Sequence, residues 1–140
     1  MLLPLLALLG CATAGNGLVD FRIEGDAIPQ PLVAVASDPA QGRKIVMGRD
    51  GNCLLCHALP ESGARFMGNL APPLSGVGAR LSRGQLRLQL VDSMRLNRDT
   101  IMPSYYRVDG LNQVAQAFRG KPILTAQQIE DTIAYLAHLR

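Results

Sequence analysis

The chain has 140 residues, of which 48% are hydrophobic and 18% are charged, and its formal net charge is +3. This length allows one domain of ordinary size, and the balance of apolar and charged residues excludes a disordered or fibrous chain. Aromatic residues make up only 4% of the chain and Trp is absent, so the core is short of large rings. The composition therefore predicts a compact domain whose core is completed by something that the chain does not encode.

The charge is concentrated in the middle of the chain. Residues 43–107 carry ten Arg and Lys against four Asp and Glu, whereas residues 15–42 have a net charge of −3 and residues 108–140 a net charge of zero. Twelve of the fourteen cations are Arg, which suits bidentate contacts to anions. The basic residues of this segment have two possible interpretations, a solvated surface or a site that binds an anion or an acidic partner. The sequence contains no nucleic-acid-binding motif.

The first residues predict an exported protein. Residues 2–10 form an apolar run that is too short to span a bilayer and fits a secretory signal peptide. We expect this peptide to comprise residues 1–14, with an Ala-Thr-Ala cleavage site at residues 12–14. The alternative is a lipobox at residues 8–11, Leu-Leu-Gly-Cys, in which cleavage precedes Cys11 and a lipid on Cys11 anchors the chain to a membrane.

An irregular N-terminal extension and a first helix are expected next. Residues 15–37 are rich in polar residues and Pro and show no sustained period, although a short strand around Val33 and Val35 is an option. Asp38-Pro39 is a helix start, with Asp as the cap and Pro in the first turn. This helix is expected to end near Met47, because glycines follow it.

Two capping boxes predict two further helices, one opened by Ser82 and Gln85 and the other by Thr125 and Gln128. The apolar stripes expected on them are Leu86, Leu90, Val91 and Met94 in the first, and Ile129, Ile133, Leu136 and Leu139 in the second. The segments 58–81 and 96–124 are predicted as loops rich in Gly and Pro. Loops of this length indicate a function or another ordering element.

The segment from Cys53 to His57, Cys-Leu-Leu-Cys-His, is the attachment signature of c-type haem. Two thiols at this spacing can form thioethers with the two vinyl groups of one porphyrin, and His57 then ligates the iron from one face. A thioredoxin-like redox pair lacks its βαβ context here, and a disulfide between the two cysteines leaves His57 unexplained. A zinc site would have only His138 and Cys11 as further obvious donors. We therefore predict one covalently bound haem c, attached through Cys53 and Cys56.

Met102 is the predicted second axial ligand of the iron. It lies 45 residues after His57, far enough along the chain to wrap around a porphyrin. Pro103 favours an extended backbone at Met102 and removes a competing amide donor. His or Met is the usual second ligand of an electron-transfer haem, and Met raises the reduction potential.

The other methionines and the second histidine are weaker candidates. Met47 and Met67 lie close to the attachment segment in sequence, so neither reaches the far face of a porphyrin easily. Met94 falls on the apolar stripe of the middle helix and is expected to be a core methionine. His138, near the end of the last predicted helix, is expected to be a surface or helix-end histidine.

The order of these elements over residues 38–140 resembles class I cytochromes c: a helix, Cys-x-x-Cys-His, a Pro-containing loop, a middle helix, a Met loop and a final helix. Residues 71–80, Ala-Pro-Pro-Leu-Ser-Gly-Val-Gly-Ala-Arg, are similar to the Pro-x-Leu-x-Gly-Val loop of that family. The resemblance implies an all-α, class I cytochrome c fold wrapped around one haem. It also implies that the Pro72 carbonyl accepts the Nδ1 proton of His57 and that Arg80 lies near the haem propionates.

A closer resemblance lies in the Met loop and the tail. Residues 101–107, 120–125, 129–131 and 134–136 are similar to the SoxX family, small monohaem cytochromes of bacterial sulfur oxidation. The resemblance implies a periplasmic heterodimer with SoxA, a larger haem protein. That complex couples thiosulfate oxidatively to a cysteine of the carrier SoxYZ, an L-cysteine S-thiosulfotransferase activity. This chain, with no catalytic residue of its own, would receive the electrons and pass them to a downstream cytochrome.

Two other functions are open on the residues alone. One is a freely diffusing class I cytochrome c without a role in sulfur chemistry. The other is a haem enzyme or gas sensor with an open sixth iron site. An intact second axial ligand would indicate an electron carrier and not a haem enzyme or gas sensor. A stable complex with a second haem protein would indicate a SoxX-type subunit and not a freely diffusing cytochrome c.

Overall fold

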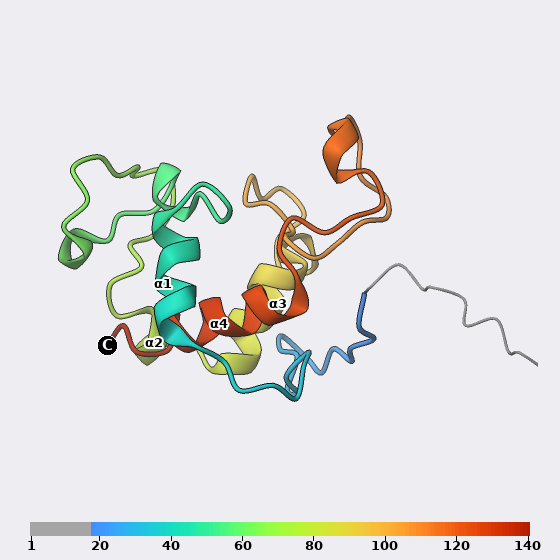
Figure 1. The fold of residues 1–140 in the computed structure, drawn as a ribbon, viewed down its shortest axis with the longest axis horizontal. Helices are drawn as coiled ribbons and strands as arrows, with labels where there is room; N and C mark the ends of the chain where they lie inside the picture. The colour runs from blue at the N-terminus through green and yellow to red at the C-terminus, as the bar shows by residue number, and fades with distance from the viewer. Residues whose placement is uncertain (1–17) are drawn as a thin grey trace, which may run out of the picture.

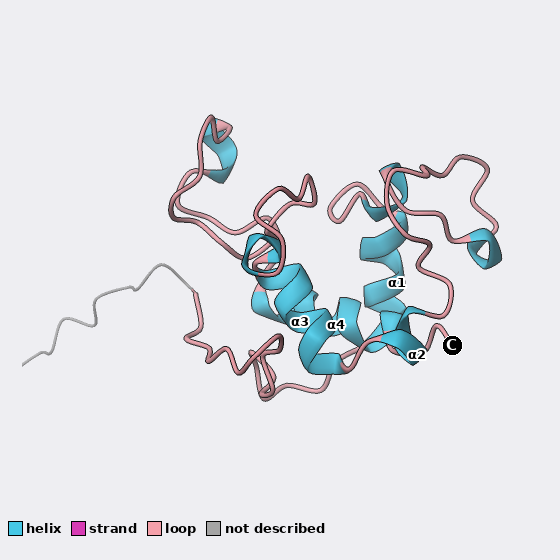
Figure 2. Ribbon diagram, turned by 180° about the vertical axis from the view of Figure 1, so that it is seen from behind, coloured by secondary structure: helices cyan, strands magenta, loops and turns pink. Residues whose placement is uncertain are grey.

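Four α-helices and four short 3-10 helices, joined by long loops, form the part of the chain that the computed structural model describes, residues 18–140. The α-helices are α1 (Pro39–Met47), α2 (Val77–Arg80), α3 (Arg83–Val91) and α4 (Ala126–Leu136), and the 3-10 helices are η1 (Cys53–Leu55), η2 (Pro60–Ser62), η3 (Ser93–Arg95) and η4 (Gln116–Phe118). Figure 2 shows helices and loops but no strand in this range. The signal peptide and lipobox predicted in residues 1–14 lie outside the described residues.

The predicted starts of the three main helices are confirmed. The Asp38 carboxylate accepts a hydrogen bond from the backbone nitrogen of Ala40 at 2.8 Å, and α1 ends at Met47 as expected. Both capping boxes are formed, since the hydroxyls of Ser82 and Thr125 each accept from the backbone nitrogen three residues on, at 3.2 Å. These interactions satisfy amides that a helix leaves without partners in its first turn.

The packing of α1 against α4 depends on a glycine. Gly42 is buried, and a Cβ atom at this position would overlap the backbone carbonyl of Asp131 in α4. The Asp131 carboxylate accepts from the backbone nitrogen of Asp38 at 2.8 Å, which fixes the start of α1 on α4. Val46 from α1 and Ile133 from α4 are completely buried. Figure 1 shows these helices beside each other at the centre of the molecule, with α3 on the other side of α4.

A buried ion pair joins α3, α4 and the N-terminal extension. The Arg87 guanidinium donates to both carboxylate oxygens of Glu130, at 2.6 and 2.9 Å, and both side chains are buried. Arg87 also donates to the carbonyl of Ile28 at 2.6 Å, and Glu130 accepts from the backbone nitrogen of Leu32 at 2.9 Å. The extension is thereby held on the helices, and the strand considered around Val35 is not formed.

The prediction that Met94 is a core methionine of the middle helix is wrong. The helix α3 ends at Val91, because Asp92 has a non-helical backbone with φ of −150°. Met94 therefore lies in η3, is 38% exposed, and its sulfur accepts from Nη1 of Arg107 at 3.6 Å. The other residues of the α3 stripe, Leu86, Leu90 and Val91, are buried as expected. In the stripe expected on the last helix, Leu139 lies beyond the end of α4 and is half-buried.

The two long segments predicted as loops contain short helices. The first, 58–81, includes η2 and the single-turn helix α2, and the second, 96–124, includes η4. In Figure 1 these segments extend from opposite sides of the helical core. None of the helices in residues 18–140 has the length and apolar character that crossing a membrane requires.

Candidate cofactor site

A cavity of about 1190 Å³ lies between the attachment segment and the two long loops. It exceeds the roughly 300–1,000 Å³ usual for ligand pockets, so it has room for a large cofactor. All of the site residues expected from the sequence line it, namely Cys53, Cys56, His57, Pro72, Arg80 and Met102. The long segments 58–81 and 96–124 thus bring His57 and Met102, which are 45 positions apart in the chain, to the same cavity.

The walls of this cavity carry apolar side chains that the protein itself leaves exposed. Leu55, Leu70 and Ile101 line it, although 65%, 71% and 77% of their surfaces are accessible. Large apolar groups gathered around a concave surface indicate a bound apolar partner. A porphyrin would cover them, which fits the shortage of aromatic residues in the chain's own core.

The attachment segment presents its two thiols and the imidazole from a single turn. The backbone nitrogens of Cys56 and His57 both donate to the carbonyl of Cys53, at 3.2 and 3.0 Å. Asn52, just before this turn, has a left-handed backbone with φ of 49°. Both thiols are free. This donor set fits attachment of one haem by two thioethers.

Tyr105 contacts the attachment segment from the Met loop. Its buried hydroxyl donates to the carbonyl of Gly51 at 2.5 Å. Burial raises the pKa of the Cys53 thiol to about 11, and a hydrogen bond with Tyr105 opposes part of this rise. Burial also raises the pKa of Tyr105 above its usual value, so this residue is a neutral hydrogen-bond donor. Tyr105 therefore links the loop that carries Met102 to the turn that carries the thiols.

The His57 ring is held by the backbone of the Pro-containing loop. Its Nδ1 lies 2.6 Å from the carbonyl oxygen of Pro72, which requires that Nδ1 carry the proton and donate. In this tautomer the lone pair is on Nε2, and that nitrogen is free to bind a metal. The loop is itself fixed, since the backbone nitrogen of Ala71 donates to the carbonyl of Cys56 at 3.0 Å.

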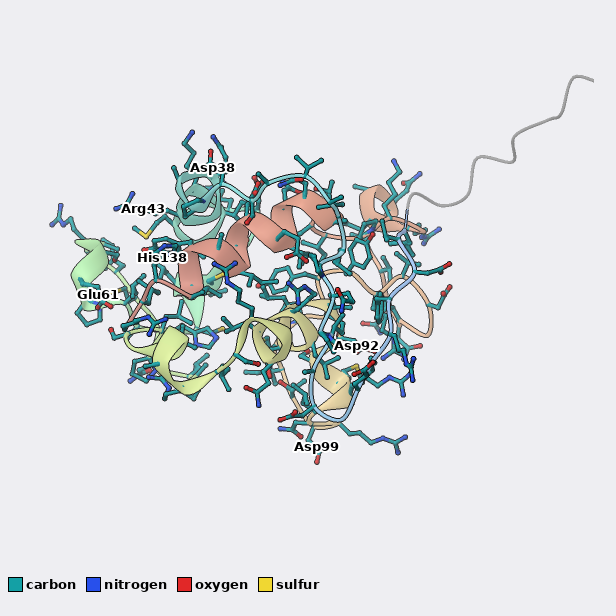
Figure 3. The ribbon with its side chains drawn as sticks, turned by 90° about the horizontal axis from the view of Figure 1, so that it is seen from below. Asp38, Arg43, Glu61, Asp92, Asp99 and His138 are labelled. Atoms are coloured by element: carbon teal, nitrogen blue, oxygen red, sulfur yellow. The ribbon has the colours of Figure 1, made fainter. Side chains whose placement is uncertain are left out.

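Arg80 stabilises the same loop. Its two terminal nitrogens donate to the carbonyls of Ser75 and Pro73, at 2.6 and 2.7 Å. Pro73 directly follows Pro72, whose carbonyl faces His57. The Ser75 hydroxyl donates to the carboxylate of Glu61 at 2.6 Å and lowers the pKa of that exposed carboxyl. Figure 3 shows Glu61 on η2, at the edge of the molecule. The contacts of Arg80 assign it a role in shaping the loop besides the contact to propionates implied by the resemblance.

Met102 is fixed by polar contacts on both sides of its backbone. The Ser93 hydroxyl donates to the carbonyl of Met102 at 2.7 Å, and the backbone nitrogen of Met102 donates to the Thr100 hydroxyl at 3.1 Å. The Ser104 hydroxyl donates to the Asp92 carboxylate at 3.0 Å, which attaches the loop to the end of α3. The thioether of Met102 is thus held at the cavity wall.

The weaker ligand candidates lie elsewhere, since none of Met47, Met67, Met94 and His138 lines the cavity. The Met67 sulfur accepts from the backbone nitrogen of Leu59 at 3.2 Å, and His138 lies at the end of α4, with Nδ1 2.5 Å from the Ala134 carbonyl (Figure 3). Within residues 18–140, no three His, Cys, Asp or Glu side chains gather as a metal-binding group. The zinc alternative therefore has no donor set there.

Comparison with known proteins places the chain in a class. The family model "Cytochrome c" matches residues 39–140, and the chain belongs to the cytochrome c family. Membership implies a covalently bound haem c. Among solved structures, the chain is similar to the crystal structure of SoxXA from P. pantotrophus, with 34% identity and a TM-score of 0.78 over 85% of this chain and 93% of that chain. It is a SoxX-like class I cytochrome c, which confirms the predicted fold and resemblance. No curated protein sequence matches it.

Proposed function

We propose that this chain is the electron-transfer subunit of a periplasmic SoxAX-type complex that oxidises thiosulfate. The similarity to SoxXA over nearly all of the solved chain carries this proposal. Attachment of haem c takes place outside the cytoplasm in bacteria, which supports an exported protein. One haem per chain is part of this proposal, and the pair of free thiols that lines the cavity supports it.

The proposed roles of the site residues follow from their contacts. Cys53 and Cys56 would form the thioethers, and His57 and Met102 would bind the iron. When bound, the haem supplies a one-electron ferric–ferrous couple. The Pro72 carbonyl fixes the orientation of the His57 ring through Nδ1, at 2.6 Å.

The chain also limits rearrangement during electron transfer. Met102 is held through its backbone by Ser93 and Thr100, which would limit its movement when the iron changes oxidation state. The cationic residues that line the cavity are Arg49, Arg80, Arg107 and Lys121, against Asp50 and Asp99. This excess of two positive charges matches the charge of two ionised propionates, so the cations outside the cavity are the ones available to attract an acidic partner.

The sulfur chemistry belongs to the partner. Joining thiosulfate to a cysteine thiol of SoxYZ forms an S–S bond and releases a proton and two electrons. A subunit with one haem accepts these electrons one at a time and passes each to a downstream cytochrome. The lack of a reactive cysteine outside the attachment pair in residues 18–140 agrees with this division.

Co-expression with the SoxA-type subunit of the same organism tests this function. We expect a one-to-one complex on size-exclusion chromatography, and reduction of both haem proteins when thiosulfate and SoxYZ are added. The matched control omits the SoxA-type subunit, and the haem of this chain should then stay oxidised. Elution of the chain alone in the presence of that subunit would instead indicate a freely diffusing cytochrome c.

A further inference from the structure

The N-terminal extension reaches from the helical core to the loop that carries Met102. Its anchor lies at α3, where the backbone nitrogen of Ile28 donates to the carbonyl of Gly84 at 3.0 Å and the Ile28 carbonyl accepts from Arg87 at 2.6 Å. The Ile28 side chain is buried in the core. Residues 18–32, which we call the strap, are therefore a fixed part of the fold and not a loose tail.

The upstream end of the strap contacts Tyr106, four residues after Met102. The Tyr106 hydroxyl accepts from the backbone nitrogen of Val19 at 2.8 Å. The rings of Phe21 and Tyr106 are tilted with their centroids 6.5 Å apart, a distance at which two aromatic rings attract each other. Both rings line a second, small cavity of about 170 Å³, together with Asp92 at the end of α3, which Figure 3 labels. The strap thus covers the outer side of the Met102 loop.

This outer contact is weaker than the contacts that hold the loop to the core. Tyr105 is held from inside, since its backbone nitrogen donates to the carbonyl of Leu90 at 2.9 Å and its side chain is buried. On the strap, Val19 and Phe21 are 38% and 40% exposed, so their contact with Tyr106 buries little apolar surface. Such a contact can open while the core stays folded.

We infer that the strap controls how readily Met102 leaves the iron. The inference rests on the proposed function, in which Met102 is an axial ligand. With the strap in place, Tyr106 is covered and the Met102 loop is held against the end of α3. Release of the strap uncovers Tyr106, so the loop opens more often and the sixth position of the iron becomes accessible to small ligands.

Tyr106→Phe and Phe21→Ala, made separately in the full-length haem protein, test this control. The first removes only the hydroxyl that accepts from Val19, and the second removes the ring of the strap. One net hydrogen bond, or one aromatic pair, corresponds to about a fivefold change in an equilibrium constant. We therefore expect imidazole to bind the ferric form of each variant about fivefold more tightly than the wild-type protein. Phe66→Ala is the matched control, because Phe66 is 85% exposed and lines neither cavity, and it should bind imidazole as the wild-type protein does.

Hydrogen exchange measured by mass spectrometry separates local release from a general loss of stability. Peptides that cover residues 100–108 should take up deuterium faster in both variants, while peptides from α1 and α4 should exchange as in the wild-type protein. Faster exchange in all of these peptides would assign the strap a role in overall stability alone and would overturn the inference. Unchanged imidazole binding in either variant would overturn it as well.

Met102→Ala distinguishes this failure from failure of the proposed ligand set. If Met102→Ala opens the iron while Tyr106→Phe and Phe21→Ala bind imidazole as the wild-type protein does, Met102 is the ligand and the strap does not control it. If Met102→Ala leaves the spectrum unchanged, the assignment of Met102 as ligand is itself wrong.

Discussion

Met102→Ala will leave the haem attached but open the iron to solvent and to small ligands. The proposed thioethers at Cys53 and Cys56 do not depend on Met102, so the haem content per chain should stay the same. If Met102 is the proposed sulfur ligand, its loss should change the ferric iron from low spin to high spin. It should also lower the reduction potential, on the order of 0.1 V or more, because Met ligation raises it. Visible absorption spectra and potentiometric titration measure both effects.

Met94→Ala is the matched control for this experiment. Met94 lies in η3, outside the cavity, and 38% of its surface is exposed. Its removal should leave the spectrum and the potential as they are in the wild-type protein. A high-spin wild-type protein that binds added ligands readily would contradict the electron-carrier account and favour a haem enzyme or gas sensor.

Gly42→Ala will destabilise the fold by about 3 kcal/mol or more. Alanine gains about 1 kcal/mol over glycine in the interior of a helix. Here the new Cβ would overlap the backbone carbonyl of Asp131, which cannot move aside as a flexible side chain could. The packing cost therefore exceeds the helix gain, and α1 must separate from α4. Urea unfolding followed by circular dichroism measures the change in the free energy of unfolding.

Gln41→Ala provides the control at the neighbouring position. Gln41 is exposed, so its replacement should change the free energy of unfolding by no more than about 0.5 kcal/mol. Equal stability of Gly42→Ala and wild type would mean that the close approach of α1 and α4 is not required.

Features that depend on neighbouring residues could be predicted from the sequence. The Asp38 cap, the two capping boxes and the attachment signature each involve residues within a few positions of one another, and all are present. The same local logic failed at Met94, because the helical period does not indicate where a helix ends. Asp92 leaves the helical conformation there, and its carboxylate accepts from Ser104 instead.

Features formed between distant segments could not be predicted in this way. Arg87 and Glu130 are 43 residues apart, and the sequence shows each only as a charge beside an apolar stripe. A charged residue within such a stripe is nonetheless a signal, since buried charges occur almost only in pairs. Gln89, an uncharged polar residue between two leucines, is a weaker signal of this kind, and its contact from Nε2 to the Met102 sulfur at 3.2 Å depends on where the Met102 loop lies.

The intact mass of the chain tests the central claim most directly. The chain should be isolated from cells that carry out c-type haem attachment and measured under denaturing, reducing conditions. Our account predicts the mass of the processed chain plus one haem, and no added haem in the Cys53→Ser/Cys56→Ser double variant. A haem that separates from the denatured wild-type chain, or one retained by the double variant, would contradict it.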